Sequence, residues 1–455
     1  MSKSINHVDP ADGRLPGLLR RFGWNATSFQ MCEPGFQFFW ADDDACVGYV
    51  DTGSAWIAAG APVCAPERLA SVAKAFVAEA GRVGRRVCFF AVEARFAELS
   101  GLRALAIGDQ AVWDPGGWAE VLQVSRGLRE QLRRARAKGI GVRVAQPTDA
   151  GTVTPELAGA LDRVTQRWLG TREMAPMGFL VRVDPLTPLP GHRFYLAERD
   201  GVLVAFLQVT PIFSRAGWLF QNLVRLPEAP NGVSELLIDA AMCDARTAGC
   251  ELVTMGLAPL SGNVSPVLAT VRWLGRALFD FDGLRAFRAK LRPTAWTTQF
   301  ACFPSSQGAT RSLVDVLTAF ANGSLVRFAV RSVLRGPSIL IRLMAALLVP
   351  WTMALVLAGD EWFPRPWIKW FWVAFDVVVL AGLVYLGSRW RDRVARVLVV
   401  AIAGDALMTA TQALCWNLRR GWGGALHGAI VAAALVAPPF AAFVLYRAHR
   451  RLAAP

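Results

Sequence analysis

The chain has 455 residues, enough for two or three domains, and its hydrophobic content of 54% with a mean hydropathy of +0.34 argues against a wholly soluble protein. Its net charge of +14 favours anionic partners such as nucleic acid, phosphate ligands or an anionic membrane, although arginines beside membrane spans would produce the same excess. Eight scattered cysteines without a C-x-x-C pair argue against a disulfide framework or a zinc site. The sequence contains no G-x-S-x-G, P-loop or H-E-x-x-H motif, which argues against serine or metal hydrolysis.

The N-terminal stretch MSKSINHVDPADGRLPG contains no apolar run, so we expect no signal peptide and a cytosolic location for the N-terminal domain. We expect residues 1–27 to be an extension and residues 28–148 to form a first α/β half. Apolar runs predict strands, and the spacing of apolar residues predicts helices. These elements are strands at Phe36–Trp40, Ala45–Val50, Ser54–Gly60 and Arg85–Val92, a helix at Pro66–Gly84, a helix from Ser125, and a closing strand in GVRVAQP.

The helix that begins at Ser125, SRGLREQLRRARAKG, is strongly basic. Its arginines, with Arg129, Arg133 and Arg134 among them, are candidates for contacts with the phosphate backbone of an RNA. A solvated surface helix, or a helix lying on anionic lipid, remains an alternative.

Residues 149–310 show the same order of elements, which predicts a second half. The expected elements are a helix at Pro155–Leu169, strands at Arg193–Arg199, Val202–Thr210 and Ala216–Val224, a helix at Gly232–Ala248, and a strand at Leu252–Met255. A meander followed by helix, strand and helix is the order of a GNAT-like acyltransferase fold, and its repetition suggests a tandem pair.

Polar residues gather around this second half. Asn222 and Arg225 lie at the end of a predicted strand, and Glu235 lies in the first turn of the next helix, whose free N–H groups could bind an anion or an oxyanion. Glu235 could instead only complement the helix dipole. We expect the strand that ends at Met255 to lead into a loop, Gly256–Gly262, at a strand end where α/β proteins bind ligands. A plain structural strand end is the alternative.

The segment Phe281–Trp296 brings Arg288 and Lys290 beside aromatic residues. It is a candidate clamp for a phosphate or a carboxylate, with a basic surface helix as the alternative.

The last quarter predicts a transmembrane domain, residues 343–455, joined by a basic amphipathic linker, residues 311–342. Four apolar segments have roughly the length of a span: Leu343–Ala358, Trp367–Gly387, Val394–Cys415 and Gly424–Tyr446. Ten arginines flank the spans on one side (Arg331, Arg335, Arg342, Arg389, Arg391, Arg393, Arg396, Arg447, Arg450 and Arg451). Four basic residues flank them on the other side (Arg365, Lys369, Arg419 and Arg420). The positive-inside rule therefore predicts that both termini are cytosolic.

Two acids, Asp376 and Asp405, fall inside the predicted spans. An acid inside the membrane is a candidate functional group, although a hydrogen bond between helices is the simpler interpretation.

Seven sequence motifs follow one another along the chain in the order in which a known protein family has them. They are GAP (Gly60–Pro62), LREQLRRARAKG, RWL (Arg167–Leu169), NLVR (Asn222–Arg225), NGVSELL (Asn231–Leu237), MGLAPLSG (Met255–Gly262) and FDGLRAFRAKLRPTAW. From about Phe29 to Pro304 the chain thus resembles the C-terminal synthase domain of the aminoacyl-phosphatidylglycerol synthases, the multiple peptide resistance factor family. The chain departs from the family pattern in having Asn222 where DLMR has Asp, and Ala61 where GDP has Asp.

The resemblance implies an α/β (α+β) tandem GNAT-like domain followed by an all-α transmembrane domain of about four helices, in the bacterial inner membrane. It implies transfer of an aminoacyl group from charged tRNA to an anionic membrane lipid such as phosphatidylglycerol, with no cofactor. Family members that flip lipids usually carry their spans before this domain, so a flippase role is not expected here.

The same resemblance assigns roles to residues. Arg225 and Lys290 would hold phosphate or ester oxygens, and Glu235 and Asn222 would orient the attacking hydroxyl or the substrate amine. The substrate-binding residues would be Gly256, Ala258, Pro259, Ser261 and Arg288, and Arg129, Arg133 and Arg134 would bind tRNA. The alternatives are a GNAT-type acyltransferase that uses an acyl thioester, and a catalytically inactive lipid- or tRNA-binding homologue.

Overall fold

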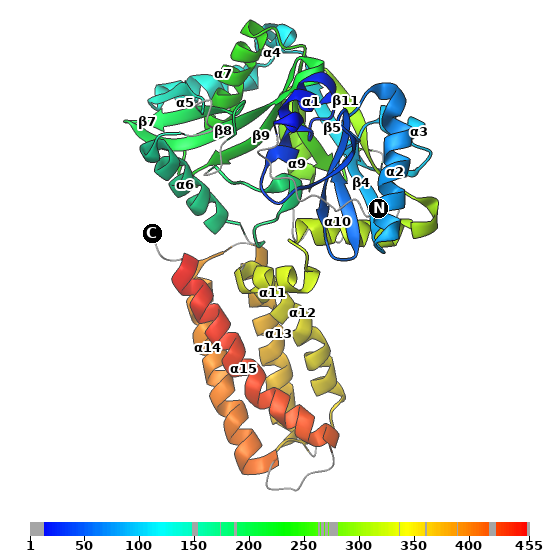
Figure 1. Ribbon diagram of the computed structural model, residues 1–455. Coiled ribbons are helices and arrows are strands. Elements are labelled where there is room, and N and C mark those ends of the chain that lie inside the picture. Colours follow the sequence, from blue (N-terminus) through cyan, green and yellow to red (C-terminus); the bar gives the residue numbers. More distant parts are fainter. Residues whose placement is uncertain are drawn as a thin grey trace. The chain divides into compact units, whose positions relative to one another are not determined.

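The computed structural model describes residues 13–147, 153–172, 174–185, 189–262, 264, 268, 272, 281–335, 337–359, 362–388, 390–417 and 425–452. The chain divides into two compact units, one of residues 1–171 and 176–328 and the other of residues 172–175 and 329–455. Figure 1 labels the elements of both units.

The first unit is built on one mixed sheet of eleven strands. The strands are β1 Gln37–Asp42, β2 Ala45–Asp51, β3 Ala55–Ala59, β4 Arg86–Val92, β5 Arg103–Trp113, β6 Ile140–Ala145, β7 Arg193–Arg199, β8 Val202–Ile212, β9 Gly217–Arg225, β10 Leu252–Pro259 and β11 Ala295–Phe303. Their order across the sheet is β1-β2-β3-β4-β11-β5-β10-β9-β8-β7-β6. The pairs β3–β4 and β9–β10 are parallel, and the other pairs are antiparallel.

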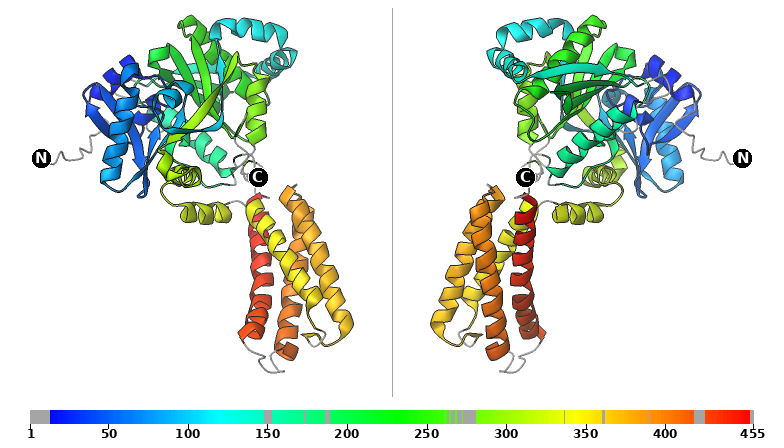
Figure 2. Two further views of the ribbon diagram at one scale, coloured as in Figure 1. Left: turned by 90° about the vertical axis from the view of Figure 1, so that its right-hand side faces the viewer. Right: turned by 90° about the vertical axis from the view of Figure 1, so that its left-hand side faces the viewer.

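Helices lie on both faces of this sheet (Figures 1 and 2). In chain order the α-helices are α1 Arg14–Phe22, α2 Leu69–Arg82, α3 Ala94–Leu99, α4 Trp118–Val124, α5 Arg126–Ala137, α6 Pro155–Gly170, α7 Val233–Thr247, α9 Phe281–Lys290 and α10 Ala309–Phe320. The short 3₁₀ turns are η1 Phe29–Cys32, η2 Pro66–Arg68, η3 Pro115–Gly117, η4 Phe179–Val181, η5 Phe213–Arg215 and η6 Ser305–Gln307.

Alternation of side chains along the strands explains this layering. In β3, Ala55 and Ile57 join the core under α1 and α10, whereas Trp56 and Ala58 join the core under α2. In the other half of the sheet, α5 and α7 share one core with the strands, and α6 shares another core on the opposite face.

The two halves of the sheet share strands. β11, near the end of the first unit, lies between β4 and β5, and β5 lies between β11 and β10. Each half is therefore completed by a strand from the other part of the chain. The boundary predicted near residue 148 stays a prediction: β6, which precedes it in the sequence, pairs with β7 at the far edge of the second half of the sheet.

The strand that was expected to end at Met255 continues to Pro259, so the prediction of a loop from Gly256 to Gly262 was wrong at its start. Leu252–Thr254 pair with β9, the register then shifts, and Leu257–Pro259 pair with β5 alone. Gly256 lies at this shift with a φ of +68°, a backbone conformation that favours glycine. What looked like a strand end is a bulge inside the strand.

The second unit is helical. Its helices are α12 Pro337–Leu357, α13 Pro366–Ser388, α14 Asp392–Gln412 with a π-helical end at Ala413–Asn417, and α15 Ala425–Leu452, and they run side by side in Figure 2. Among the described residues, four helices are long and apolar enough to cross a membrane, or five if the bent pair Ala309–Phe320 and Leu325–Ser332 counts as one span. The predicted linker is itself helical, because α10 and α11 Leu325–Arg335 cover most of it. Arg389, Arg419 and Arg420 of the charge count lie outside the described residues.

The two acids of the predicted spans lie in α13 and α14. The Thr352 hydroxyl of α12 lies 3.4 Å from the Asp376 carboxylate, and the Thr409 hydroxyl donates to Asp405 at 2.9 Å. The Thr352–Asp376 contact is between helices, as the simpler interpretation of these acids expected.

Candidate functional site

The parallel strands β9 and β10 separate in the middle of the sheet. Only Gly217–Leu219 of β9 pair with β10; beyond Leu219, β9 continues on β8 while β10 continues on β5. Both strands therefore lead their carboxyl ends into a fork, the kind of place where open α/β sheets bind ligands. The predicted site residues lie on either face of this fork.

On the α7 face, Glu235 and Lys290 form an ion pair, with Lys290 Nζ 2.8 Å from Glu235 Oε1. Gly232 precedes α7 with a φ of +93°, and a Cβ there would lie 2.2 Å from the Gln131 carbonyl oxygen, so only glycine allows this close start of the helix. Glu235 is buried in the first turn of α7, while the Lys290 side chain is 41% exposed at the end of α9. The structure thus brings together two residues 55 positions apart that the sequence nominated separately.

Arg288, close before Lys290 in α9, is buried and binds the bulge of β10. Its guanidinium donates to the carbonyl oxygens of Gly256 at 2.9 Å and Met255 at 2.7 Å. Burial lowers the pKa of Arg288 to about 10. Its two hydrogen bonds hold the bulge in place. Sequence analysis had predicted instead that Arg288 binds substrate.

The remaining predicted substrate-binding residues close the gap between β10 and β5. The Ser261 hydroxyl donates to the Ala258 carbonyl at 2.8 Å and accepts from the Asp109 N–H at 3.2 Å. Ala258 is fully buried, and Pro259 pairs with Gly108 of β5. These contacts make the segment a rigid edge of the fork.

Asn222 lies on the other face. With Gln208 it belongs to the strand face that also carries Phe206 and Val224, which pack with α6, whereas α7 packs on Leu207 and Phe220. The structure therefore does not bring Asn222 together with Glu235. Arg225, the last residue of β9, is exposed.

Asn222 lines a hollow with an empty volume of about 250 Å³, open mouth included. Its lining residues are Glu33, Pro34, Arg182, Asp184, His192, Gln208 and Asn222. The Asn222 amide donates to Gln208 Oε1 at 2.9 Å, and Gln208 Nε2 lies 3.3 Å from His192 Nδ1. A bulge opposite Gln208 also turns Gln221 toward this side, where its amide donates to Glu33 at 2.5 Å.

Two groups in this hollow have shifted pKa values. Burial raises the pKa of Glu33 to about 7, against the hydrogen bond from Gln221 and the charge of Arg182, which both lower it. Burial lowers the pKa of His192 to about 4, so this imidazole is neutral at pH 7. A carboxyl group that titrates near neutrality is suited to accept a proton or to bind a cation.

Sequence reasoning did not nominate Glu33, Arg182, Asp184, His192 or Gln208. One signal was present: Gln208 is the one polar amide in the apolar strand VLVAFLQVT, and such a buried amide needs a partner. The other members come from separate segments, and only the pairing of β7, β8 and β9 brings them together.

The basic helix α5 has two kinds of arginine. Arg129 donates to the backbone carbonyls of Leu122, at 2.6 Å, and Gln123, so it closes the end of α4. Arg133 and Arg134 both pair with Glu130, at 2.9 and 2.8 Å, and remain 73% and 55% exposed. These two side chains remain open to solvent, whereas Arg129 binds the backbone of α4.

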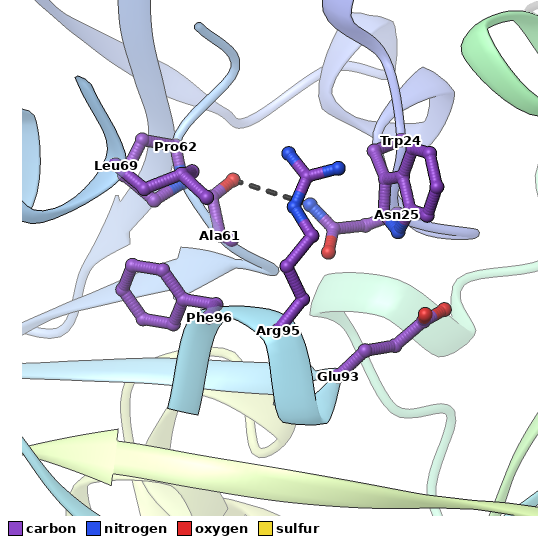
Figure 3. Close-up of a pocket in the computed structure, with 8 residues that line it drawn as sticks. All are labelled: Trp24, Asn25, Ala61, Pro62, Leu69, Glu93, Arg95 and Phe96. Atoms are coloured by element: carbon purple, nitrogen blue, oxygen red, sulfur yellow. Dashed lines mark hydrogen bonds between the residues drawn. The ribbon is translucent and has the colours of Figure 1, made fainter. Parts of the chain in front are cut away.

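A second hollow, of about 240 Å³, lies at the carboxyl end of β3 and includes Ala61 (Figure 3). The Arg95 guanidinium lies 4.4 Å from the centre of the Trp24 ring, and the Asn25 amide donates to the Ala61 carbonyl at 3.3 Å. Figure 3 shows the Glu93 carboxylate pointing away from Arg95, and this carboxylate pairs instead with Arg215 at 2.7 Å. The departure from GDP to GAP therefore places a methyl group in a hollow that contains a guanidinium.

Among the described residues, no three His, Cys, Asp or Glu side chains are grouped closely enough to hold a metal ion. The expectation that no cofactor is needed stays a prediction.

Comparison with known proteins identifies proteins that are similar to this chain. The chain is 25% identical over 305 residues to the phosphatidylglycerol lysyltransferase of Bacillus subtilis (strain 168), a match that covers 64% of this chain and 35% of that protein. It is 26% identical over 243 residues to the lysylphosphatidylglycerol biosynthesis bifunctional protein LysX of Mycobacterium avium (strain 104), covering 50% and 20%. The match thus spans about a third or less of these relatives' length.

The solved structure of L-PGS from Bacillus licheniformis has the same fold, with a TM-score of 0.59 at 22% identity over 69% of this chain and 98% of that one. This likeness confirms the predicted fold class, a GNAT-like α/β domain, to which the present chain adds four apolar helices. The family described as phosphatidylglycerol lysyltransferase, C-terminal, matches residues 17–303, which include all eleven strands and both faces of the fork. The chain belongs to this family.

Proposed function

We propose that this protein is an aminoacyltransferase that moves an aminoacyl group from charged tRNA to the headgroup of a membrane lipid such as phosphatidylglycerol. The observation that carries the proposal is the family match over residues 17–303, which covers the sheet, its fork and the polar groups on both faces. The named activity of the Bacillus subtilis relative supports lysine and phosphatidylglycerol as the first substrates to test.

The chemistry requires little of the protein beyond positioning. The aminoacyl ester of tRNA is already activated, so a lipid hydroxyl can attack its carbonyl carbon, and the 3′-terminal ribose hydroxyl of the tRNA leaves. One ester replaces another, and the proton of the attacking hydroxyl ends on the leaving oxygen. Holding two reactants in line and stabilising the oxyanion supplies most of the rate enhancement in such a transfer.

We propose that the predicted roles are divided between the two faces of the fork. Lys290, kept in place by Glu235, and exposed Arg225 are the cationic groups for phosphate or ester oxygens. Asn222 serves the opposite face, together with the hollow around Glu33. We therefore assign different parts of the two substrates to the two faces, with the reacting carbonyl at the fork.

We further propose a multi-pass protein of the bacterial inner membrane with both termini in the cytosol. Four apolar helices support the membrane location, and the arginine distribution supports the orientation. This arrangement would hold the α/β unit on the side where charged tRNA is found.

The test is a comparison of lipid extracts. The full chain and a Lys290→Met variant are expressed in a bacterial host, and their lipids are analysed by mass spectrometry. We expect a new lipid, heavier by one amino-acid residue and carrying a free amine, in the wild type, and roughly 100-fold less of it in the variant.

A new lipid with a fatty-acyl mass would instead support the thioester-dependent acyltransferase. No new lipid from folded protein, with charged tRNA and phosphatidylglycerol present, would favour the inactive binding homologue.

A further inference from the structure

The hollow beside Asn222 is lined by charged and polar side chains. Its lining contains two carboxylates, Glu33 and Asp184, and one guanidinium, Arg182. The other polar side chains in the lining are uncharged: the amides of Gln208 and Asn222, and His192, whose buried imidazole stays neutral at pH 7. A ligand that pairs with the Glu33 carboxylate is a cation.

Glu33 is the carboxylate of this hollow that lacks a cationic partner among the described residues. It follows η1 and is partly buried, and its hydrogen-bond partner is the neutral amide of Gln221, at 2.5 Å. In the described part of the chain it forms no ion pair: Arg182, which lines the same hollow, donates to the Pro34 carbonyl at 3.1 Å instead. A dehydrated carboxylate without a cationic partner is costly, and an incoming cation would recover that cost.

The surrounding groups favour an ammonium over a metal ion. His192 Nδ1 already accepts the Leu189 N–H at 3.0 Å, which removes it as a metal ligand. Asn222 donates through its nitrogen to Gln208, so its carbonyl oxygen remains to accept a hydrogen bond. An ammonium has three N–H donors, and Glu33 and Asn222 offer acceptors from neighbouring elements.

We propose that Glu33 is the anionic group of an ammonium-binding subsite, and that this subsite takes the amine of the aminoacyl group being transferred. The proposal rests on the proposed function and specifies which residue recognises the amino acid. Glu33 supplies the negative charge that position 222 lacks in this chain, from a different element but in the same hollow. An amine held as ammonium is not a nucleophile, so attack on the ester is left to the lipid hydroxyl.

The first experiment measures binding directly. Full-length protein in detergent micelles is titrated by calorimetry with L-lysinamide and L-alaninamide, and with alaninamide acetylated on its amine as an uncharged match. We expect saturable binding of the free amines and none of the acetylated probe. Glu33→Gln should weaken the binding roughly 10- to 100-fold, the range for a hydrogen bond to a charged group.

Moving the charge gives the sharper test. The double variant Glu33→Gln/Asn222→Asp restores one carboxylate to the hollow, so we expect its affinity to return to within roughly threefold of the wild type. Glu120→Gln, which neutralises an exposed glutamate of α4, is the matched control and should leave binding unchanged. Because burial disfavours the charged form of Glu33, the Glu33→Gln variant should fold at least as well as the wild type, which thermal melting checks.

Several outcomes would overturn the proposal. They are equal affinity of wild type and Glu33→Gln, equal binding of the acetylated probe, no saturable binding at the highest soluble probe concentration, and loss of binding in Asp184→Asn but not in Glu33→Gln. The lipid assay separates this failure from that of the proposed function. Glu33-dependent amine binding without a new lipid would support the ammonium subsite and contradict the transfer reaction. A new lipid made equally well by Glu33→Gln would support the transfer reaction and contradict the ammonium subsite.

Discussion

Glu33 and His192 line the same hollow and influence stability in opposite senses. The pKa of Glu33 is raised to about 7, so its favourable contribution is complete below its unfolded value near 4.5 and is lost as pH rises toward 7. The pKa of His192 is lowered to about 4, so its contribution is complete above its unfolded value near 6.5 and is lost as pH falls toward 4. Between these limits the two effects partly cancel.

Removing either group should reveal the effect of the other. We expect the melting temperature of Glu33→Gln to rise with pH from 4 to 6.5 more steeply than that of the wild type, and that of His192→Gln to fall between pH 4.5 and 7. Arg182 and Asp184 also face the hollow and remain in every variant. Thermal melts of the full chain at closely spaced pH values measure this, with Glu120→Gln as control; parallel curves for wild type and Glu33→Gln would contradict it.

At the same scale, the candidate site was only partly predictable. Glu235 and Lys290 stood out because one opens a helix and the other ends a basic helix, and their 2.8 Å contact follows from how α7 and α9 pack. Glu33 and His192 carried no pattern of their own, and Gln208 carried only that of a lone amide in an apolar strand. A single polar residue acquires a role only when strands far apart in the sequence are paired, and no local rule specifies that pairing.

Among the elements, α5 allows the proposed tRNA contact to be separated from folding. We expect the double variant Arg133→Glu/Arg134→Glu to bind charged tRNA more weakly, with a salt slope reduced by roughly 0.7–0.9 for each phosphate that the helix no longer binds. Arg129→Glu should instead lower the melting temperature, because Arg129 binds the carbonyls of Leu122 and Gln123. Fluorescence anisotropy across a range of KCl concentrations measures the first effect.

Arg143→Glu provides the control for this series. Arg143 is an exposed arginine of β6 that pairs with Glu198, so reversing it makes half of that change in charge, away from α5. Unchanged affinity and slope in the α5 double variant would remove tRNA binding from this helix and leave a solvated or lipid-facing surface. Wild-type lipid transfer by that variant would also favour the thioester alternative.

Sequence analysis missed helices α1, α3, α4 and α10 and the two strands that join the halves, β5 and β11. β5 reads RALAIGDQAVW, and Gly108 and Asp109 interrupt its apolar character. Yet Gly108 is needed because a Cβ there would lie 2.3 Å from the Ala258 carbonyl oxygen of β10. β11 follows a basic helix and mixes Thr and Gln with aromatic residues, so apolar and polar residues do not alternate clearly along it. Most other strands and helices were predicted within a few residues, because each shows a clear period of its own.

At the scale of the whole molecule, the four apolar helices should serve mainly to keep the α/β unit at its lipid substrate. A chain ending at Ser324 retains α10 and the complete sheet and lacks the spans. We expect it to bind lysinamide as the full chain does, but to transfer lysine to phosphatidylglycerol in vesicles at least about tenfold more slowly at equal protein concentration. Tethering gives the full chain an effective lipid concentration that a freely diffusing domain lacks.

Detergent micelles and a longer truncation complete this comparison. With lipid dispersed in micelles the tether loses its advantage, so the two rates should converge. A chain ending at Arg335 keeps α11, whose exposed Val326 and Val330 alternate with arginines as in helices that lie in the membrane interface. On vesicles this longer chain should transfer lysine at a rate between those of the full chain and the chain ending at Ser324. If the chain ending at Ser324 matched the full chain on vesicles, anchoring would not explain the spans, and Asp376 and Asp405 would become the first residues to test for another role.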